Sequence, residues 1–366
     1  MYMKYSSWFK LALVMAGVVG LSACGGHSGQ STQQSSSDAQ TLLGAGSTFV
    51  YPLYSKLFAL YHQQTGIRVN YQSIGSGGGI LQLINKTVDF GDSDAPLTAD
   101  QEQQAGTPVV HIPICSGAVV LTYNLPGIQD TLLFTPNVLA GIYLGTITRW
   151  NDPALQSINP QVKLPDLPIA VVHRSDGSGT TNIFTNYLAK ISPDWKNKVG
   201  ASTSVNWPVG LGGKGNEGVS GLVKQTPGAI GYVELAYAIQ NQMPVAKVQN
   251  ASGHFITPSI ASTQAASNIN LPADAKVFVT NTSAPDGYPI SGFTWAILYR
   301  EQHYGDRSRA RAEELVKLFW WVIHDGQAYC ANLHYAPLSP AATTTAEKLL
   351  QSVTFDGQPL LHAAKP

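Results

Sequence analysis

The stretch Val171-Val172-His173-Arg174-Ser175-Asp176-Gly177-Ser178-Gly179-Thr180 passes from an apolar, β-branched strand into a glycine-rich turn. Apolar residues then recur at helical spacing up to residue 191, so the pattern predicts a strand, a tight turn and a helix. The unpaired N–H groups and positive dipole of that helix N-terminus suit an anion, and Arg174 adds a planar, permanent charge. Taken alone, a capped helix with Arg174 paired to Asp176 is the simpler interpretation.

Two further stretches repeat this design. Leu43-Gly44-Ala45-Gly46-Ser47-Thr48-Phe49 leads into a helical pattern with Pro52 near its first turn, a position that suits proline. Ile74-Gly75-Ser76-Gly77-Gly78-Gly79 follows a strand-like run and precedes another helical pattern. Each turn alone is a weak signal. Three turns rich in glycine, serine and threonine, each opening a helix, make anion binding the leading hypothesis.

The start of the chain has the composition of a targeting segment. Lys4 and Lys10 form a basic region, and the apolar run at 11–20 is too short to span a bilayer. Leu21-Ser22-Ala23-Cys24-Gly25 resembles the lipobox of bacterial lipoproteins, so we expect a signal peptide at 1–23 and a lipid on Cys24. The alternative is an ordinary exported protein that is cleaved nearby.

The segment at 24–40 is rich in serine, glutamine and glycine and has almost no apolar side chains. Such a composition predicts a flexible tether rather than a folded element. The body of the protein would then begin near residue 41.

The charge balance argues against nucleic acid as a partner. The chain has 22 basic and 22 acidic side chains, and loss of Lys4 and Lys10 with the signal peptide leaves 20 basic against 22 acidic. No basic stripe is present that could neutralise a phosphate backbone. An anion site on this chain must therefore depend on local donors.

Strand-like and helix-like patterns alternate over the rest of the chain, which is long enough for two domains. Among them, 109–114 and 118–123 read as two strands, and Thr135-Pro136 and Asp152-Pro153 read as helix starts. We find no internal repeat. The alternation predicts an α/β fold in which helices cover the sheets.

The sequence offers little for catalysis. It contains neither an H-E-x-x-H nor a G-x-S-x-G motif, and its histidines and cysteines lack metal-ligand spacing. A phosphoesterase that used Ser76 or Ser178 as its nucleophile would need a nearby base or metal to activate the hydroxyl. We therefore expect no enzyme activity, no metal and no cofactor.

Eight stretches, in order, resemble the phosphate-binding protein (PstS) family of bacterial phosphate ABC transporters. The resemblance covers about residues 42–361 and implies a type II periplasmic-binding-protein fold, in which two α/β lobes are joined by two crossover strands with the ligand cleft between them. The stretches are GAGSTF at 44–49, GSGGG at 75–79, DFGDSDAP at 89–96, IYLG at 142–145, WNDP at 150–153, RSDGSGT at 174–180, WPVGLGGKGN at 207–216 and PGAIGYVE at 227–234.

The resemblance also implies which residues hold the ligand. Asp176 would orient Arg174, and Asp94 would be the one carboxylate that faces the anion. Lobe one would comprise 41–114 plus 291–362, and lobe two 115–290. The implied phosphate contacts are Ser47, Thr48, Phe49, Ser76, Asp94, Arg174, Ser178, Gly179 and Thr180.

The resemblance further implies a protein that binds inorganic phosphate outside the cytoplasmic membrane and delivers it to ABC permease subunits. We expect a monomer in the periplasm or on the outer face of the cell envelope, held to the membrane only through a lipid on Cys24. Two alternatives remain: a phosphate-sensing or surface lipoprotein without a transport role, and the phosphoesterase.

Cys115 and Cys330 remain once Cys24 is lipidated. In an oxidising compartment two such cysteines suggest a disulfide. Two separate buried thiols fit the sequence equally well, so both interpretations stay open.

Overall fold

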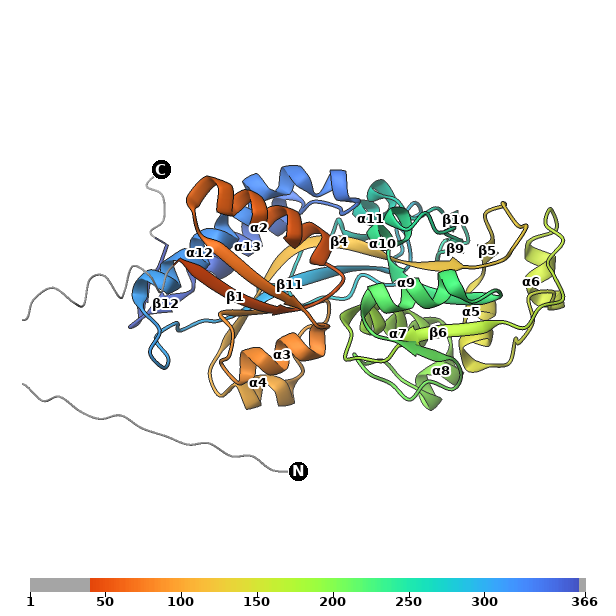
Figure 1. The fold of residues 1–366 in the computed structure, drawn as a ribbon, viewed down its shortest axis with the longest axis horizontal. Helices are drawn as coiled ribbons and strands as arrows, with labels where there is room; N and C mark the ends of the chain where they lie inside the picture. Colours follow the sequence, from red (N-terminus) through yellow and green to blue (C-terminus); the bar gives the residue numbers. More distant parts are fainter. Residues whose placement is uncertain (1–39, 362–366) are drawn as a thin grey trace, which may run out of the picture.

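Eight strands form one continuous sheet in the computed structural model, which describes residues 40–361 (Figure 1). Parallel pairs at both ends of the sheet flank antiparallel pairs in its middle, where β11 and β8 both pair with β4. The alternation of strands and helices confirms the α/β fold. The strands, in sheet order, are β2 (Arg68–Ser73), β1 (Thr41–Gly46), β3 (Phe90–Ser93), β11 (Ser291–Tyr299), β4 (Val109–Tyr123), β8 (Ala229–Glu234), β6 (Ala170–Arg174) and β7 (Leu211–Gly213).

Helices cover the faces of this sheet (Figure 1). Short strands outside it are β5 (Leu133–Phe134), β9 (Lys247–Gln249) and β10 (Phe255–Ile256), and the pair β12 (Thr354–Phe355) and β13 (Gln358–Pro359). The helices are α2 (Tyr51–Thr65), α3 (Ser76–Ile84), α4 (Ala99–Ala105), α5 (Pro136–Leu144), α6 (Pro153–Ile158), α7 (Gly179–Ile191), α8 (Pro193–Lys198), α9 (Gly215–Gln225), α10 (Leu235–Gln240), α11 (Ile260–Ser267), α12 (Arg309–Ile323) and α13 (Pro340–Gln351), with the short 3-10 helices η1 (Asp325–Tyr329) and η2 (Ala331–Leu333).

Strand β4 is common to both ends of the sheet. Residues 109–118 pair with β11, and residues 119–123 pair with β8. A second link runs beside it, where the N–H of Val119 donates to the carbonyl of Ile290 (2.8 Å) just before β11. We call the part around β1, β2, β3 and β11 the β1 half, and the part around β6, β7 and β8 the β6 half.

The expectation of two strands at 109–114 and 118–123 was wrong, because β4 runs unbroken through both. Its irregularity takes another form. The pairing with β11 shifts register between Thr294 and Trp295, which face Cys115 and Pro113. Pro113 has no N–H to donate to the neighbouring strand. The strand accommodates this proline with a β-bulge and continues beyond it. The bulge lies beside Thr294, a residue that matters below.

Local sequence explains why the first helix begins where it does. Pro52 fits the first turn of α2, and Gly66 ends the helix in the left-handed region (φ 79°). Leu53, Leu57 and Tyr61 recur at four-residue spacing and are buried against the sheet. The turn at 47–50 is therefore held between a largely buried strand and the buried face of a helix.

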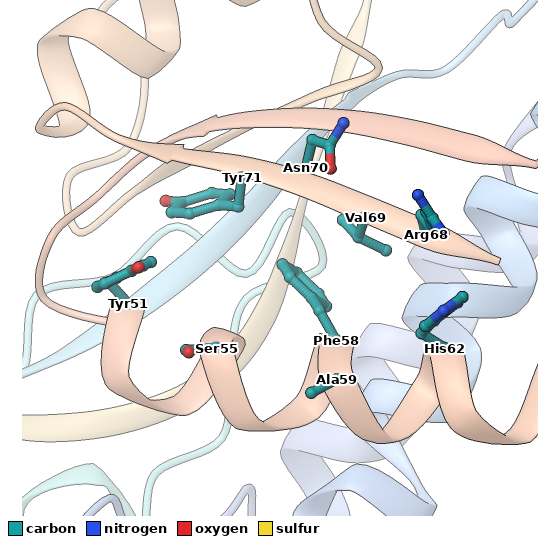
Figure 2. A pocket seen from close by; sticks show the side chains of 9 residues that line it. All are labelled: Tyr51, Ser55, Phe58, Ala59, His62, Arg68, Val69, Asn70 and Tyr71. Carbon is teal, nitrogen blue, oxygen red and sulfur yellow. The ribbon is translucent and has the colours of Figure 1, made fainter. Parts of the chain in front are cut away.

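A groove of about 420 Å³ lies between α2 and the edge strand β2 (Figure 2). In Figure 2 the side chains of Tyr51 and Tyr71 lie at one end of this groove, and those of His62 and Arg68 at the other. None of the predicted anion-binding residues lines it. The groove is therefore separate from the glycine-rich turns.

Cys115 and Cys330 are free, buried thiols, so the structure has separate thiols rather than the disulfide. Burial raises the pKa of the Cys330 thiol to about 12, and it also raises that of Cys115, which lies within β4. Both thiols are protonated at neutral pH and inert as nucleophiles.

We expect two thiols to react when the body of the protein, produced without Cys24, is unfolded without reductant, and none to react rapidly while it is folded. The measurement is a thiol titration with a chromogenic disulfide reagent, before and after addition of denaturant. A reading of zero thiols after unfolding would mean that the two cysteines are bridged.

Within residues 40–361, no helix combines the length and the apolar character that crossing a membrane requires. The predictions for the signal peptide at 1–23, for Cys24 and for nearly all of the tether concern residues outside the described part of the chain.

Candidate functional site

The three glycine-rich turns meet where the two halves of the molecule touch. The N–H of Gly77, at the start of α3 in the β1 half, donates to the carbonyl of Gly177 in the β6 half (2.9 Å). A Cβ on Gly77 would lie 3.1 Å from Cα of Gly177, so the two backbones pack closely. Glycine suits this position because a side chain would push the two backbones apart by a few tenths of an ångström.

The first turn supplies hydroxyl and backbone groups between β1 and α2. The Ser47 hydroxyl accepts the N–H of Phe49 (2.9 Å) and donates to Oδ1 of Asp94 (2.6 Å). Oγ1 of Thr48 accepts the side-chain amide of Asn216 from the β6 half (2.8 Å). Ser47, Thr48 and Phe49 are all buried.

Ser76, the first residue of α3, joins the two halves. Its hydroxyl oxygen accepts the N–H of Gly179 at the start of α7 (3.0 Å) and lies 3.3 Å from the N–H of Asp94. Because that oxygen accepts, its own proton remains available for a further acceptor.

Arg174 ends β6 and makes a two-point contact with Asp176. Its Nε donates to Oδ1 of Asp176 (2.8 Å), and its second terminal nitrogen donates to Oδ2 (2.6 Å). Burial opposes ionisation of Asp176, but the hydrogen bonds and charge of Arg174, with the N–H of Gly215, hold its pKa below the ordinary value. The remaining nitrogen of Arg174 lies 3.4 Å from Oγ1 of Thr180. The predicted pairing is therefore present, and it fixes the plane of the guanidinium.

Asp94 follows β3 and is 1% exposed. Its Oδ1 accepts hydrogen bonds from Ser47 (2.6 Å) and Thr294 (2.8 Å), whereas its buried Oδ2 has no partner among the described residues. Burial raises the pKa of Asp94 to about 6, against the lowering effects of the two hydroxyls and of Arg174. An unpaired buried carboxylate oxygen is costly unless something donates to it.

The third turn opens α7. The Ser178 oxygen caps the helix by accepting the N–H of Thr181 (3.0 Å), which leaves its proton free to donate. Gly179 packs against the β1 half, because a Cβ there would lie 2.5 Å from Oδ2 of Asp94 and from the Ser76 hydroxyl. The helix N-terminus thus faces the unpaired carboxylate oxygen across the boundary.

Two polar residues in this cluster were not predicted. The Asn216 side chain donates to Thr48 (2.8 Å) and to Thr180 (3.1 Å), so one amide links both halves. Asn216 ends one of the eight family-like stretches, and this position was the only feature of the sequence that could have indicated a role in the site. Thr294 lies in strand β11, which is buried along its whole length, and no pattern in that strand distinguishes its hydroxyl from that of Ser291.

The cluster brings together every residue that the sequence predicted for it. It holds several hydroxyls, three glycine-rich turns, one fixed positive charge and the Oδ2 atom of Asp94, which lacks a donor among the described residues. Among residues 40–361, no group of three or more histidine, cysteine, aspartate or glutamate side chains is placed to hold a metal ion. The arrangement suits a small oxyanion that carries at least one proton, which could donate to Asp94.

The fold and this cluster between the β1 half and the β6 half define a substrate-binding protein, and residues 31–325 match the model of the PBP superfamily domain. The chain is 47% identical over 301 residues to the phosphate-binding protein PstS of Xylella fastidiosa (strain 9a5c), with 81% of each chain covered. It is 44% identical to PstS of Haemophilus influenzae, over 84% of this chain and 91% of that one. The chain belongs to the PstS family of phosphate-binding proteins.

The similar solved structures are informative about the fold alone, because their sequences share little identity with this chain, 18% and 22% in two of them. A high-affinity periplasmic phosphate-binding protein (PfluDING) bound with phosphate superposes with a TM-score of 0.68 at 22% identity, covering 84% of this chain and 93% of its own. This likeness confirms the type II periplasmic-binding-protein fold.

We expect the substitution Gly179→Ala to prevent the two halves from closing around a ligand. The added Cβ would meet side-chain atoms of Asp94 and Ser76 at 2.5 Å, so close that one of these groups or the α7 N-terminus has to shift. Overpacking of this kind costs about 1–3 kcal/mol, which corresponds to a roughly 5- to 150-fold loss of phosphate affinity.

The matched control for Gly179→Ala is Gly221→Ala in α9, where a Cβ meets nothing within 4 Å. The control should bind phosphate like the parent and be slightly more stable, since alanine favours a helix. Isothermal titration of both variants with phosphate makes the comparison. Equal affinity in Gly179→Ala would contradict the tight contact.

Proposed function

We propose that this protein binds inorganic phosphate outside the cytoplasmic membrane and delivers it to an ABC permease for import. Membership of a family of phosphate-binding proteins supports the ligand, and the buried cluster between the two halves offers a place for it. The relatives are binding proteins, which is consistent with a chain that is not an enzyme.

The observation that carries the proposal is the unpaired Oδ2 of Asp94. A carboxylate accepts hydrogen bonds and cannot donate them, so its ligand must bring a proton. Phosphate near neutral pH keeps at least one P–OH group and also has anionic oxygens for Arg174 and the helix N-terminus. The groups proposed to contact it are Ser47, Thr48, Phe49, Ser76, Asp94, Arg174, Ser178, Gly179 and Thr180.

The proposed lobes are 41–114 plus 291–362 and 115–290, with the hinge at the two links beside β4. Thr48, Ser76 and Asp94 come from lobe one, and Arg174 and Thr180 from lobe two. Phosphate would then complete its hydrogen bonds only when the lobes meet, and it would stabilise the closed state differentially.

The proposed location is the periplasm or the outer face of the cell envelope, where a lipid on Cys24 holds a monomer to the membrane. The lipobox-like residues before Gly25 support this anchor. Metabolic labelling with a radioactive fatty acid should mark the parent and leave Cys24→Ala unlabelled. Equal labelling of the two would mean that Cys24 is not the anchor.

The test of the proposed ligand is a calorimetric titration of the unlipidated body with phosphate, repeated with sulfate. We expect one phosphate per chain and little heat from sulfate. No heat from either ion would refute phosphate as the ligand. Loss of phosphate uptake on deletion of the gene, restored by the parent chain, would support delivery to a permease over a sensing or surface role.

A further inference from the structure

Behind the proposed site, two buried carboxyl groups share one hydroxyl. Oγ1 of Thr294 on β11 lies 2.9 Å from Oδ1 of Asp92 on β3 and 2.8 Å from Oδ1 of Asp94. Asp92 and Thr294 are 0% exposed, so bulk solvent does not reach this contact. The other oxygen of Asp92 accepts the hydroxyl proton of Tyr54 from α2 (2.6 Å).

A count of protons shows that both carboxyl groups cannot be ionised. The hydroxyl of Thr294 has one proton and two lone pairs. It can donate its proton to one carboxylate. If the second carboxyl group were also ionised, a lone pair of the hydroxyl oxygen would face a lone pair of that carboxylate at hydrogen-bond distance, with no water to separate them. One of the two acids must therefore carry a proton on Oδ1 and donate it to Thr294.

The surroundings identify the protonated member of the pair. Asp94 feels the charge of Arg174 and accepts the Ser47 hydroxyl, and both favour its ionised form. Burial and the charge of Asp94 instead raise the pKa of Asp92 well above its ordinary value. No cation faces Asp92 within the described chain; the titratable groups around it are Tyr54 on α2, Tyr71 on β2, Asp94 after β3 and Cys115 on β4.

We propose that Asp92 is a positioning residue for anion selectivity: as a neutral acid it donates to Thr294, which turns the Thr294 hydroxyl toward Asp94 and keeps Asp94 an ionised acceptor. The chain of donors runs from Tyr54 to Asp92, from Asp92 to Thr294 and from Thr294 to Asp94. Oδ2 of Asp94 is then the one oxygen left to accept from the ligand. This inference rests on the proposed function, because it assigns the ligand's proton to that oxygen.

Substitutions separate this role from a purely structural one. In Asp92→Asn, the amide N–H can donate to Thr294 while the amide oxygen accepts from Tyr54, so asparagine reproduces the neutral acid. We expect phosphate affinity within about threefold of the parent, with sulfate still excluded. Thr294→Val keeps the shape and removes the hydroxyl, so the phosphate-to-sulfate affinity ratio should fall by about threefold to tenfold, as for one lost hydrogen bond. Thr294→Ser should restore the ratio.

The direct test is infrared spectroscopy of the ligand-free protein near neutral pH. The parent should show the C=O band of a protonated, buried carboxylic acid, and the difference spectrum against Asp92→Asn should contain that band. A difference spectrum without it would place the proton elsewhere and overturn the inference, as would loss of phosphate selectivity in Asp92→Asn. Should Asp92→Asn fail to fold, an unchanged phosphate-to-sulfate ratio in Thr294→Val would also overturn it. The infrared measurement needs no ligand, so a parent that shows the band yet binds no phosphate would refute the proposed function alone.

Discussion

Sulfate should bind to the Asp94→Asn variant, whereas we expect the parent to exclude it. Asp94 is a buried acceptor whose Oδ2 has no donor within residues 40–361, and sulfate has no proton to offer near neutral pH. A site built around a required donor rejects an analogue without it by roughly 10⁴- to 10⁵-fold. The asparagine amide can donate to either ion and carries no charge, so most of this discrimination should disappear, mainly through tighter binding of sulfate.

Competition titrations of phosphate and sulfate against parent and variant would measure this change. The matched control is Asp194→Asn, which removes the same charge from an exposed carboxylate whose partner is Lys198. The control should leave both affinities unchanged. A parent that binds the two ions comparably, or an Asp94→Asn protein that still excludes sulfate as sharply, would end this account of selectivity.

The same carboxyl group gives the sulfate affinity of the parent a pH dependence. Burial raises the pKa of Asp94 to about 6 in the ligand-free protein. Above that pH the group is ionised and only accepts; below it the group is protonated and can donate to a sulfate oxygen. Sulfate affinity should therefore rise as the pH falls through about 6, by up to tenfold per pH unit, and should stay flat in Asp94→Asn. A flat profile in the parent would place the selectivity in another group.

Phosphate affinity should fall steeply in Arg174→Ala. Arg174 is the fixed positive charge of the cluster and is 3% exposed, so each charge-assisted hydrogen bond that it makes is worth roughly 1.5–3 kcal/mol. Its removal also leaves the partly buried Asp176 without its two-point partner. We expect a loss of at least roughly 10- to 150-fold in affinity, with some loss of stability from the unpaired carboxylate.

Arg174→Lys should recover only part of that affinity. Two nitrogens of Arg174 hold Asp176 while the third points toward Thr180, and a lysine ammonium cannot reproduce this planar arrangement. The matched control is Arg149→Ala, because Arg149 pairs with Asp166 on the exposed surface, through one carboxylate oxygen and the backbone carbonyl. Surface pairs contribute little, so the control should bind phosphate normally. Parent-like binding by both Arg174 variants would remove Arg174 from the site.

Much of the site could be predicted from the sequence, because its parts are local. A glycine-rich turn that opens a helix is encoded within about ten residues, and three such turns are visible without any knowledge of their contacts. The pairing of Arg174 with Asp176 is likewise local, since the two are separated by one residue. The family-like stretches added Asp94, whose role no local pattern reveals.

Other features depend on contacts between distant parts of the chain. The amide of Asn216 reaches Thr48 across 168 positions, and the hydroxyl of Thr294 reaches Asp94 across 200. A single sequence carries no information about which distant residues touch. Neither Asn216 nor Thr294 could therefore be predicted as part of the site from its contacts. The strand β4 was divided in two for a related reason: its continuity depends on its two neighbours in the sheet, since β11 pairs with its first part and β8 with its last part.

The sequence by itself therefore determined the α/β class, the three anion-suited turns and the charged pair Arg174 and Asp176 at the third of them, because backbone propensity and side-chain chemistry act over short distances. Only the tertiary structure decided that the turns meet, that Oδ2 of Asp94 is left without a donor among the described residues, and that Asp92 and Asp94 both lie within hydrogen-bond distance of the Thr294 hydroxyl. The physical reason is desolvation. Whether a carboxyl group is ionised or neutral depends on what surrounds it once water has gone, and that environment is assembled from strands and helices that lie far apart in the sequence.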